Sequence, residues 1–294
     1  MDINYELYKV FYFVATSLSF SEASKQLYIS QSAVSQSIKT LEKKLGQPLF
    51  IRSTKKVQLT PAGKILLKHV EPAMNLIRRG ENQLLDSNIL GLGQLHIGAS
   101  DTICRYFLVP YLKQFHKKFP NVPIKVTNAT SLSCVDLLEQ GKVDLIVTNF
   151  PNAKLTHSYM QKTVFNFHDV FIVNPAHFTF KQQPVSLEEL NQYPILMLDR
   201  KSTTSEFLHN LFLQHQLELL PEIELSSNDL LIDLAKIGLG VAFIPDYCLT
   251  RESGDLIILK TKEPMPVRHL VASINPNLPT SSATEEFLKL LPEV

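Results

Sequence analysis

Residues 18–63 read LSFSEASKQLYISQSAVSQSIKTLEKKLGQPLFIRSTKKVQLTPAG, and the centre of this stretch predicts an amphipathic helix. Its apolar residues recur with the spacing of a helix face that packs inward: Val34, Ile38, Leu41 and Leu45. Polar side chains recur on another face: Ser32, Ser35, Gln36, Lys39 and Lys43. Hydroxyl, amide and amine groups suit the edges of bases and the phosphates beside them. Many surface helices carry such a polar stripe without a function, so the neighbouring segments decide between the two interpretations.

The segments around this helix predict a helix-turn-helix. An earlier helix has the residue spacing of a core-facing surface: Leu7, Val10, Phe11, Val14 and Ala15. A second helix is predicted to open at Phe20, with Ser21 as its N-cap and Glu22 in its first turn, where a negative charge suits the helix dipole. Ser30 is predicted to cap the third helix, and Gly46 is predicted to end it.

A basic hairpin is predicted to follow the third helix. Residues 48–51 and 57–59 predict two strands, and the turn between them carries cations that can reach phosphates or a narrow minor groove: Arg52, Lys55 and Lys56. In isolation such a turn is more often a solvated hairpin, but its place after a helix-turn-helix favours a DNA-binding wing. Thr60 and Pro61 predict the start of the next helix, because proline at the first helical position loses no hydrogen bond.

Charge is unevenly distributed along the chain. Residues 1–64 hold nine Lys/Arg and four Asp/Glu, whereas the whole chain has a net charge of only +1. The remainder of the chain is therefore mildly acidic. A basic N-terminal part on a near-neutral protein is expected when that part meets a polyanion such as DNA.

The N-terminal stretch resembles the LysR-type transcriptional regulators of bacteria. The residues that carry the resemblance are Ala15, Phe20, Ala23, Leu27, Ser30 to Ser35, Ile38, Leu41, Glu42, Leu45, Gly46, Leu49, Phe50, Arg52 and Leu59 to Gly63. Glu22 departs from the family, in which many members have alanine, but this position is expected to face solvent. The resemblance implies that Lys39 binds phosphate and that Arg52 enters the minor groove. It implies major-groove contacts for Gln31, Ser32, Ser35 and Gln36, and the expected DNA-binding set also includes Ser21, Lys43, Thr54, Lys55 and Lys56.

The resemblance also implies the organisation of the whole chain. It predicts an all-α winged helix-turn-helix domain, a linker helix for dimerisation and a two-lobed α/β effector domain like a periplasmic binding protein: residues 1–60, 61–90 and 91–294. Lobe 1 is expected at about 91–162 and 267–294, and lobe 2 at about 163–266. The expected partners are double-stranded operator DNA, a small effector, further copies of the chain as a dimer and tetramer, and RNA polymerase. No cofactor, metal or catalytic residue is expected.

The predicted linker helix has its own apolar pattern. Two series recur every seven residues: Leu66, Ala73 and Gly80, and Val70, Ile77 and Leu84. This seam predicts packing against a partner helix rather than on a globular core. Pro72 lies inside the pattern, so a bend or loosened turn is predicted near residues 70–72.

The rest of the chain alternates between predicted strands and helices. Strands are predicted at 94–99, 122–129, 143–148, 169–173, 194–198, 222–225, 241–244 and 267–273. Parallel sheets of this kind bind ligands at the carboxyl ends of their strands. The polar residues near those ends form the predicted effector site: Ser100, Thr102, Thr130, Ser131, Thr148, Asn149, Lys201, Ser202 and Thr203. Each hydroxyl alone is more often a helix cap, but the convergence of several strand ends favours a site for a small, oxygen-rich, anionic effector.

Other functional classes fit the sequence less well. For an enzyme, residues 238–240 begin like a dinucleotide fingerprint, but this Gly-Leu-Gly lacks the third glycine and follows a predicted helix. The nine histidines do not have metal-ligand spacing. A solute-binding protein without DNA contact would explain only residues 91–294, and the N-terminus has no signal-peptide layout.

The cysteines and the apolar runs predict a cytoplasmic protein. No apolar run approaches the roughly 20 residues that span a bilayer. An odd number of cysteines, Cys104, Cys134 and Cys248, favours a reducing compartment without a disulfide framework. We expect all of them to be small buried side chains. A thiol switch is the alternative for Cys104 and Cys134, which lie near predicted helix starts.

Overall fold

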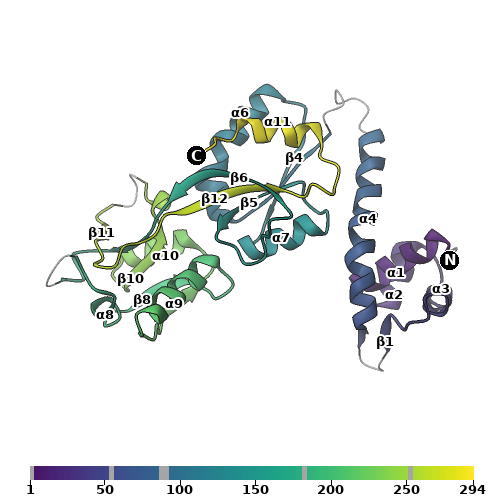
Figure 1. Cartoon of the computed structure of the whole chain (residues 1–294), viewed down its shortest axis with the longest axis horizontal. Helices are drawn as coiled ribbons and strands as arrows, with labels where there is room; N and C mark the ends of the chain where they lie inside the picture. Colours follow the sequence, from purple (N-terminus) through teal and green to yellow (C-terminus); the bar gives the residue numbers. More distant parts are fainter. Residues whose placement is uncertain (1–2, 53–55, 86–92, 181–183, 251–253) are drawn as a thin grey trace. The chain divides into compact units, whose positions relative to one another are not determined.

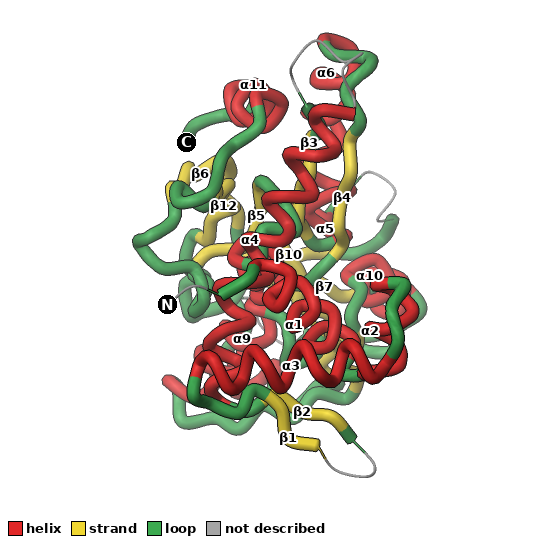
Figure 2. The backbone as a smooth tube through the Cα atoms, turned by 90° about the vertical axis from the view of Figure 1, so that its right-hand side faces the viewer, coloured by secondary structure: helices red, strands yellow, loops and turns green. Residues whose placement is uncertain are grey.

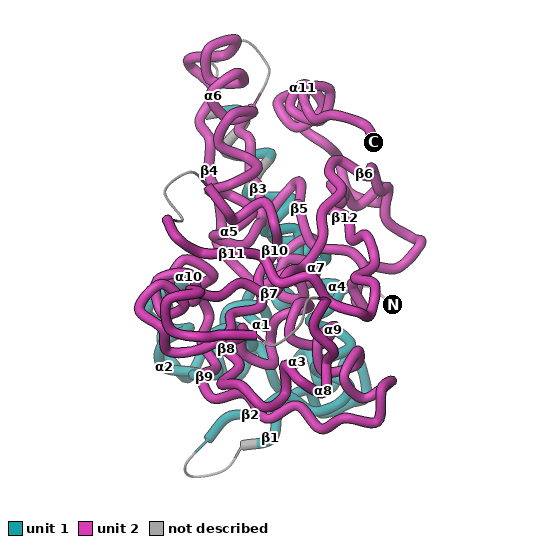
Figure 3. The backbone as a smooth tube through the Cα atoms, turned by 90° about the vertical axis from the view of Figure 1, so that its left-hand side faces the viewer, with its two compact units in different colours: residues 1–86, 139–142 teal, residues 87–138, 143–294 magenta. Residues whose placement is uncertain are grey.

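The computed structural model describes residues 3–52, 56–85, 93–180, 184–250 and 254–294 (Figure 1). The chain divides into two compact units (Figure 3). Unit 1 comprises residues 1–86 and 139–142, and unit 2 comprises residues 87–138 and 143–294. None of the described helices combines the length and the hydropathy that a bilayer crossing requires.

Unit 1 is a three-helix core with a hairpin and a long helix (Figure 2). Its elements are α1 Tyr5–Ser17, α2 Phe20–Leu27, α3 Gln31–Leu45, β1 Phe50–Arg52, β2 Val57–Leu59 and α4 Pro61–Leu85. Strands β1 and β2 pair antiparallel. The predicted inner face of α3 is confirmed, because Val34, Ile38 and Leu41 are fully buried. Leu45 is half-buried against the same core.

Most predicted helix ends are confirmed, but one is wrong. The Ser30 hydroxyl accepts a hydrogen bond from the Ala33 N–H at 3.2 Å, and Gly46 ends α3 in the left-handed conformation. The Thr60 hydroxyl accepts from the Gly63 N–H at 2.9 Å. Helix α2 is capped by Ser19 rather than by Ser21. The helix begins at Phe20, whose ring is buried in the core, so Ser21 already lies exposed within the first turn.

Helix α4 uses part of the predicted seam within its own unit. Leu66 and Val70 pack on the core of the three helices, so the expectation of a partner helix is wrong for this part of the seam. Ile77 and Leu84 remain exposed, at 56% and 81%. The helix continues through Pro72, and a bend at that point stays a prediction.

Unit 2 contains two five-stranded sheets, each with helices packed against it. The first has the strand order β4-β3-β5-β12-β6: β3 Leu95–Ala99, β4 Ile124–Asn128, β5 Leu145–Phe150, β6 Met160–Phe167 and β12 Arg268–Ile274. Its helices are α5 Asp101–Ile103, the π-helical η1 Cys104–Leu108, α6 Val109–Lys118, α7 Ser131–Glu139 and α11 Ser282–Leu290. We call this sheet with its helices the first lobe.

The second lobe is built on the sheet with strand order β11-β7-β10-β8-β9. Its strands are β7 Asp169–Val173, β8 Ile195–Leu198, β9 Ile223–Leu225, β10 Val241–Pro245 and β11 Ile257–Leu259. Its helical elements are α8 Leu187–Leu190, α9 Thr203–Gln214, α10 Asn228–Lys236 and the short 3₁₀ turn η2 Asp246–Cys248. The chain passes between the lobes at residue 168 and again through residues 260–267.

Two sequence expectations about the sheets are wrong. Both sheets are mixed rather than parallel, because β12 runs antiparallel to β5 and β6, and β7 runs antiparallel to β10 and β11. Strands β6 and β11 were also not predicted. Strand β6 belongs wholly to the first sheet, so the expected lobe boundary after residue 162 falls inside it. β6 is an edge strand with two exposed polar side chains, Gln161 and Asn166, and it lacks the apolar alternation that identifies a strand.

Candidate functional site

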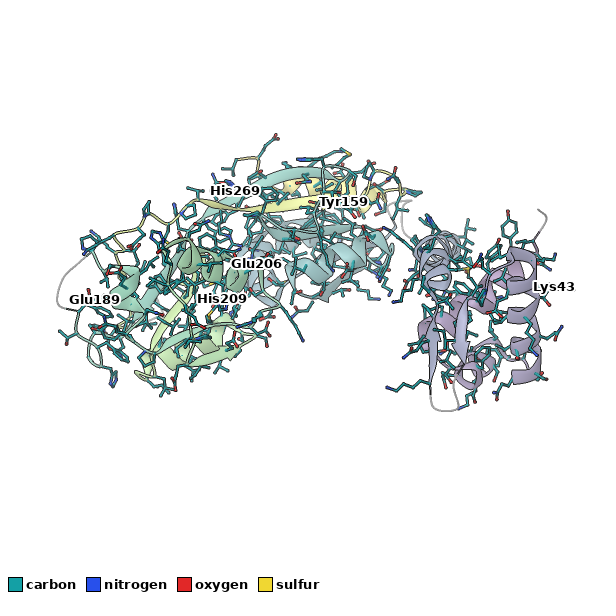
Figure 4. All side chains as sticks on the ribbon, turned by 60° about the horizontal axis from the view of Figure 1, so that its bottom comes forward. Lys43, Tyr159, Glu189, Glu206, His209 and His269 are labelled. Atoms are coloured by element: carbon teal, nitrogen blue, oxygen red, sulfur yellow. The ribbon has the colours of Figure 1, made fainter. Side chains whose placement is uncertain are left out.

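The polar face of α3 is accessible in unit 1. Gln31, Ser32, Gln36, Lys39 and Lys43 are exposed, and Ser35 is half-buried. The Lys43 side chain extends outward from the helix (Figure 4). The buried stripe fixes the rotation of α3 about its axis, so these side chains are held on its outer face.

A carboxylate that the sequence analysis did not assign holds the hairpin to α3. One Glu42 carboxylate oxygen accepts hydrogen bonds from the N–H groups of Leu49 at 2.8 Å and Phe50 at 3.2 Å. This contact fixes where β1 begins relative to the end of α3. Lys56 is exposed at the start of the return strand. Thr54, Lys55 and the side chain of Arg52 lie outside the described residues.

A cavity of about 320 Å³ lies between the two lobes of unit 2. Most of the predicted effector residues line it: Ser100, Thr102, Thr130, Ser131, Asn149, Ser202 and Thr203. Helices α7, α9 and α10 begin at this wall, as does α5, which continues into η1 and α6. The predicted convergence of strand ends on one cavity is therefore present in the structure.

The hydroxyls at the cavity wall also cap these helices. Ser100 accepts from the N–H of Ile103 at 3.3 Å, and Thr130 accepts from the N–H of Ser133 at 3.3 Å. Ser202 and Ser227 cap α9 and α10 in the same way. The same hydroxyls can therefore cap a helix and line the cavity. The helix starts supply partial positive charge, and the charged side chains among the described lining residues are Asp101 and Asp199.

Thr148 and Lys201 do not line the cavity. Strand β5 runs on to Phe150, so Thr148 lies within the strand rather than past its end. Since side chains alternate along a strand, Thr148 shares a face with Ile146 and Phe150, which belong to a buried cluster with α7 residues. Lys201 is exposed, and its backbone N–H donates to the Asp199 carboxylate at 3.0 Å.

Sequence reasoning missed several lining residues: Asn128, Asp199, Thr204, Ser226, Ser227, Asn228 and Tyr247. Ser226, Ser227 and Asn228 directly follow β9. The strand-end rule that selected Thr130 and Ser131 would have identified them, had it been applied to this strand as well.

Two asparagines join the lobes across the cavity. The Asn149 amide of the first lobe donates to the Thr203 hydroxyl of the second at 3.4 Å. The Asn228 amide of the second lobe donates to the Thr102 hydroxyl of the first at 3.0 Å. Each threonine oxygen accepts from a neighbouring nitrogen, which leaves its own O–H proton to be donated elsewhere.

A buried ion pair lies behind the cavity where the chain crosses between the lobes. The Arg268 side chain at the start of β12 is 2% exposed, and it pairs with Asp169 at the start of β7. The guanidinium also donates to Thr203 at 3.3 Å and Thr204 at 3.1 Å. Burial raises the pKa of Asp169, and the positive charge of Arg268 opposes that rise. Arg268 thereby connects the crossing segments to the start of α9.

The cysteines do not have the properties of a thiol switch. Cys134 and Cys248 are buried, as expected, and Cys104 is half-buried. Burial raises the pKa of Cys104 to about 11 and that of Cys134 to about 12, so both remain protonated thiols at neutral pH. Among the described residues there is no group of His, Cys, Asp and Glu side chains that could hold a metal ion.

Comparisons with known proteins agree with this architecture. Residues 5–64 match the family model for bacterial regulatory helix-turn-helix proteins of the lysR family, and residues 91–294 match the LysR substrate binding domain. A probable RuBisCO transcriptional regulator of Gracilaria tenuistipitata var. liui is 30% identical over 92% of this chain and 90% of its own length.

Solved structures show the same fold at low sequence identity. Full-length CbnR in complex with its target DNA has a TM-score of 0.65 and 17% identity, over 98% of this chain and 99% of that one. The regulatory domain of CcmR from Synechocystis PCC6803, in complex with 2-PG, has a TM-score of 0.61 and 20% identity. That match covers 67% of this chain and 94% of the CcmR domain.

Proposed function

The chain belongs to the LysR family of bacterial transcriptional regulators, and on that premise we propose which residues read DNA and what kind of effector the cavity binds. The polar face of α3, with Gln31, Ser32, Ser35 and Gln36, reads base edges in the major groove. Lys39 and Lys43 bind phosphates, and the β1–β2 hairpin contacts the backbone beside them.

The effector is a small anion, and one observation carries this proposal. Thr203 accepts hydrogen bonds from two side-chain nitrogens, of Asn149 and Arg268, so toward a ligand it can offer only its O–H proton. Thr102 accepts one, from Asn228, and its O–H proton is likewise free to be donated to a ligand. These O–H donors lie beside the N-termini of helices, and together they favour a ligand with oxygen acceptors and negative charge. The regulatory domain of CcmR, which has this fold, was solved in complex with 2-PG, which supports the same class of ligand.

The effector acts by changing how the lobes close. A ligand that bridges Thr102 and Thr203 adds contacts that exist only when the two lobes face each other across the cavity. Such a ligand shifts the population toward the closed arrangement by its difference in affinity for the two states. Dimers form through the exposed part of α4, including Ile77 and Leu84. Dimers then associate into tetramers, and the bound assembly contacts RNA polymerase.

Thermal unfolding of the full chain with small anions tests the effector class. The probes are 2-PG, inorganic phosphate and a set of small carboxylates, each carboxylate paired with its neutral amide. At one hundred times its dissociation constant, a bound anion should stabilise the fold by about 2.7 kcal/mol. The neutral amides should do much less.

Thr203→Val should weaken binding of the stabilising anion roughly tenfold, the effect of a hydrogen bond to a charged group. Thr127→Val on β4, outside the cavity lining, is the matched control and should bind normally. Stabilisation by the amides equal to that by the anions would contradict the proposed ligand class. Equal weakening of anion binding by Thr203→Val and Thr127→Val would show that the anion does not bind at Thr203.

A further inference from the structure

Tyr28 has an unusual backbone conformation in the turn between α2 and α3. It ends α2 with φ 55° and ψ 37°, which lies in the left-handed region. Its N–H donates to the Lys25 carbonyl, and the N–H of Ile29 donates to the Ser24 carbonyl at 3.1 Å. This hydrogen-bonded turn sets the direction in which the chain enters α3.

Two further helices of the same unit end in the left-handed conformation, α1 at Leu18 and α3 at Gly46. Glycine has no Cβ and adopts this region without strain, whereas a tyrosine there is strained. Tyr28 is therefore an unfavourable choice for the stability of the turn.

The Tyr28 side chain is also unfavourably placed for folding. It is 95% exposed, although its ring is large and mostly apolar. Within the part of the chain that the structure describes, its ring has no aromatic contact and its hydroxyl no hydrogen bond. A strained backbone that presents an exposed aromatic side chain indicates a role outside the fold itself.

The position of Tyr28 indicates that role. Two residues later Ser30 caps α3, and Gln31 and Ser32 are the first exposed residues of that helix. In helix-turn-helix proteins the N-terminal residues of this helix contact bases, so the preceding turn lies near the phosphates that flank them. A tyrosine hydroxyl is one of the side-chain groups that bind phosphate oxygens.

We infer that Tyr28 is a DNA contact, whose hydroxyl donates to a phosphate beside the bases that Gln31 and Ser32 face. The inference rests on the proposed reading of DNA by α3. The backbone strain at Tyr28 is the consequence of placing a phenol where a glycine or asparagine would stabilise the turn. A phosphate contact carries no sequence information, so its loss should weaken all DNA binding alike.

The test uses the full chain and two duplexes of equal length. One duplex is selected from a random-sequence library by the wild-type chain, and the other is its scrambled version. Tyr28→Asn should lower affinity for both duplexes about tenfold, because a charge-assisted hydrogen bond is lost. It should also slow amide hydrogen exchange in α1 to α3, since asparagine tolerates the left-handed region. Tyr28→Phe should lower affinity and leave exchange unchanged.

Leu18 provides a matched control. It ends α1 in the same left-handed region, with φ 48°, and is 47% exposed. Leu18→Asn should slow exchange and leave both affinities unchanged. An equal loss of affinity in this control, unchanged affinity in Tyr28→Asn, or faster exchange in Tyr28→Asn would each overturn the inference.

The parent proposal is tested separately on the same duplexes with Gln36→Ala. If Gln36→Ala weakens binding to the selected duplex and Tyr28→Asn does not, only the role of Tyr28 is wrong. If neither variant changes binding to either duplex, the reading of DNA by α3 is wrong as well.

Discussion

Replacing Arg268 with methionine should lower the free energy of unfolding of unit 2 by about 3–5 kcal/mol, the effect of removing one partner of a buried ion pair. Asp169 is fully buried, and the Arg268 guanidinium pairs with its negative charge. Thr203 and Thr204 lose a donor in the same change. Urea unfolding of the full chain, followed by circular dichroism, measures the loss.

The pH dependence separates this cause from a simple loss of packing. Burial already raises the pKa of Asp169, and loss of Arg268 removes the interaction that opposes the rise. A carboxyl whose pKa is higher in the folded than in the unfolded state stabilises the fold less as pH increases. The deficit of Arg268→Met should therefore shrink as pH falls toward 4, the ordinary pKa of aspartate.

Arg105→Met is the matched control for Arg268→Met. Arg105 also pairs with an aspartate, Asp229, at 3.5 Å, but its side chain is 62% exposed. Exposed pairs contribute about 0–1 kcal/mol, so this variant should unfold nearly as the wild type does. A loss below about 1 kcal/mol in Arg268→Met, or equal losses in the two variants, would contradict the importance assigned to burial of the pair.

Gly63→Ala should destabilise unit 1 by about 3 kcal/mol, at the upper end of the usual effect of overpacking. A Cβ at this position would lie 2.2 Å from the carbonyl oxygen of Leu49. That oxygen cannot easily move, because Leu49 is buried and its carbonyl accepts the Thr60 N–H at 3.0 Å. The clash should separate α4 from the start of the hairpin and strongly weaken DNA binding. Native-state hydrogen exchange, resolved by peptide, measures the loss in each unit.

Gly80→Ala in the same helix is the control for Gly63→Ala. A Cβ there meets no atom within 4 Å. Since alanine favours a helix over glycine, this variant should gain about 0.5–1 kcal/mol. If Gly63→Ala also gains stability, the close approach of α4 to β1 is not a constraint on the fold.

Local signals in the sequence predicted unit 1 well because its structure depends on nearby residues. The spacing of Val34, Ile38 and Leu41 specified the buried face of α3, and Ser30 and Gly46 specified its ends. The error at α2 was small, with Ser19 as the cap instead of Ser21. Periodicity alone could not show that Leu66 and Val70 pack within the unit. An apolar helix face has the same residue spacing whether it packs on the core of its own unit or on a helix of a second chain.

Only the part of the effector site that depends on neighbouring residues in the sequence could be predicted. The rule that ligands bind at the carboxyl ends of strands identified Thr102 and Thr203, because each follows a strand that the sequence predicted. It could not find the partners that set the hydrogen-bonding roles of these hydroxyls. Asn228 lies 126 residues from Thr102 and Arg268 lies 65 residues from Thr203, and only the closed fold brings them together. Thr148 was misplaced because β5 extends further than its apolar run.

Binding of the full chain to the selected and scrambled duplexes, measured by fluorescence anisotropy, tests most directly whether the polar face of α3 reads DNA. Gln36→Ala should cost about 1–3 kcal/mol on the selected duplex and little on the scrambled one. Gln26→Ala, an exposed glutamine of α2, should change neither affinity. Equal losses for Gln36→Ala on both duplexes, or no loss on either, would contradict base reading by this helix.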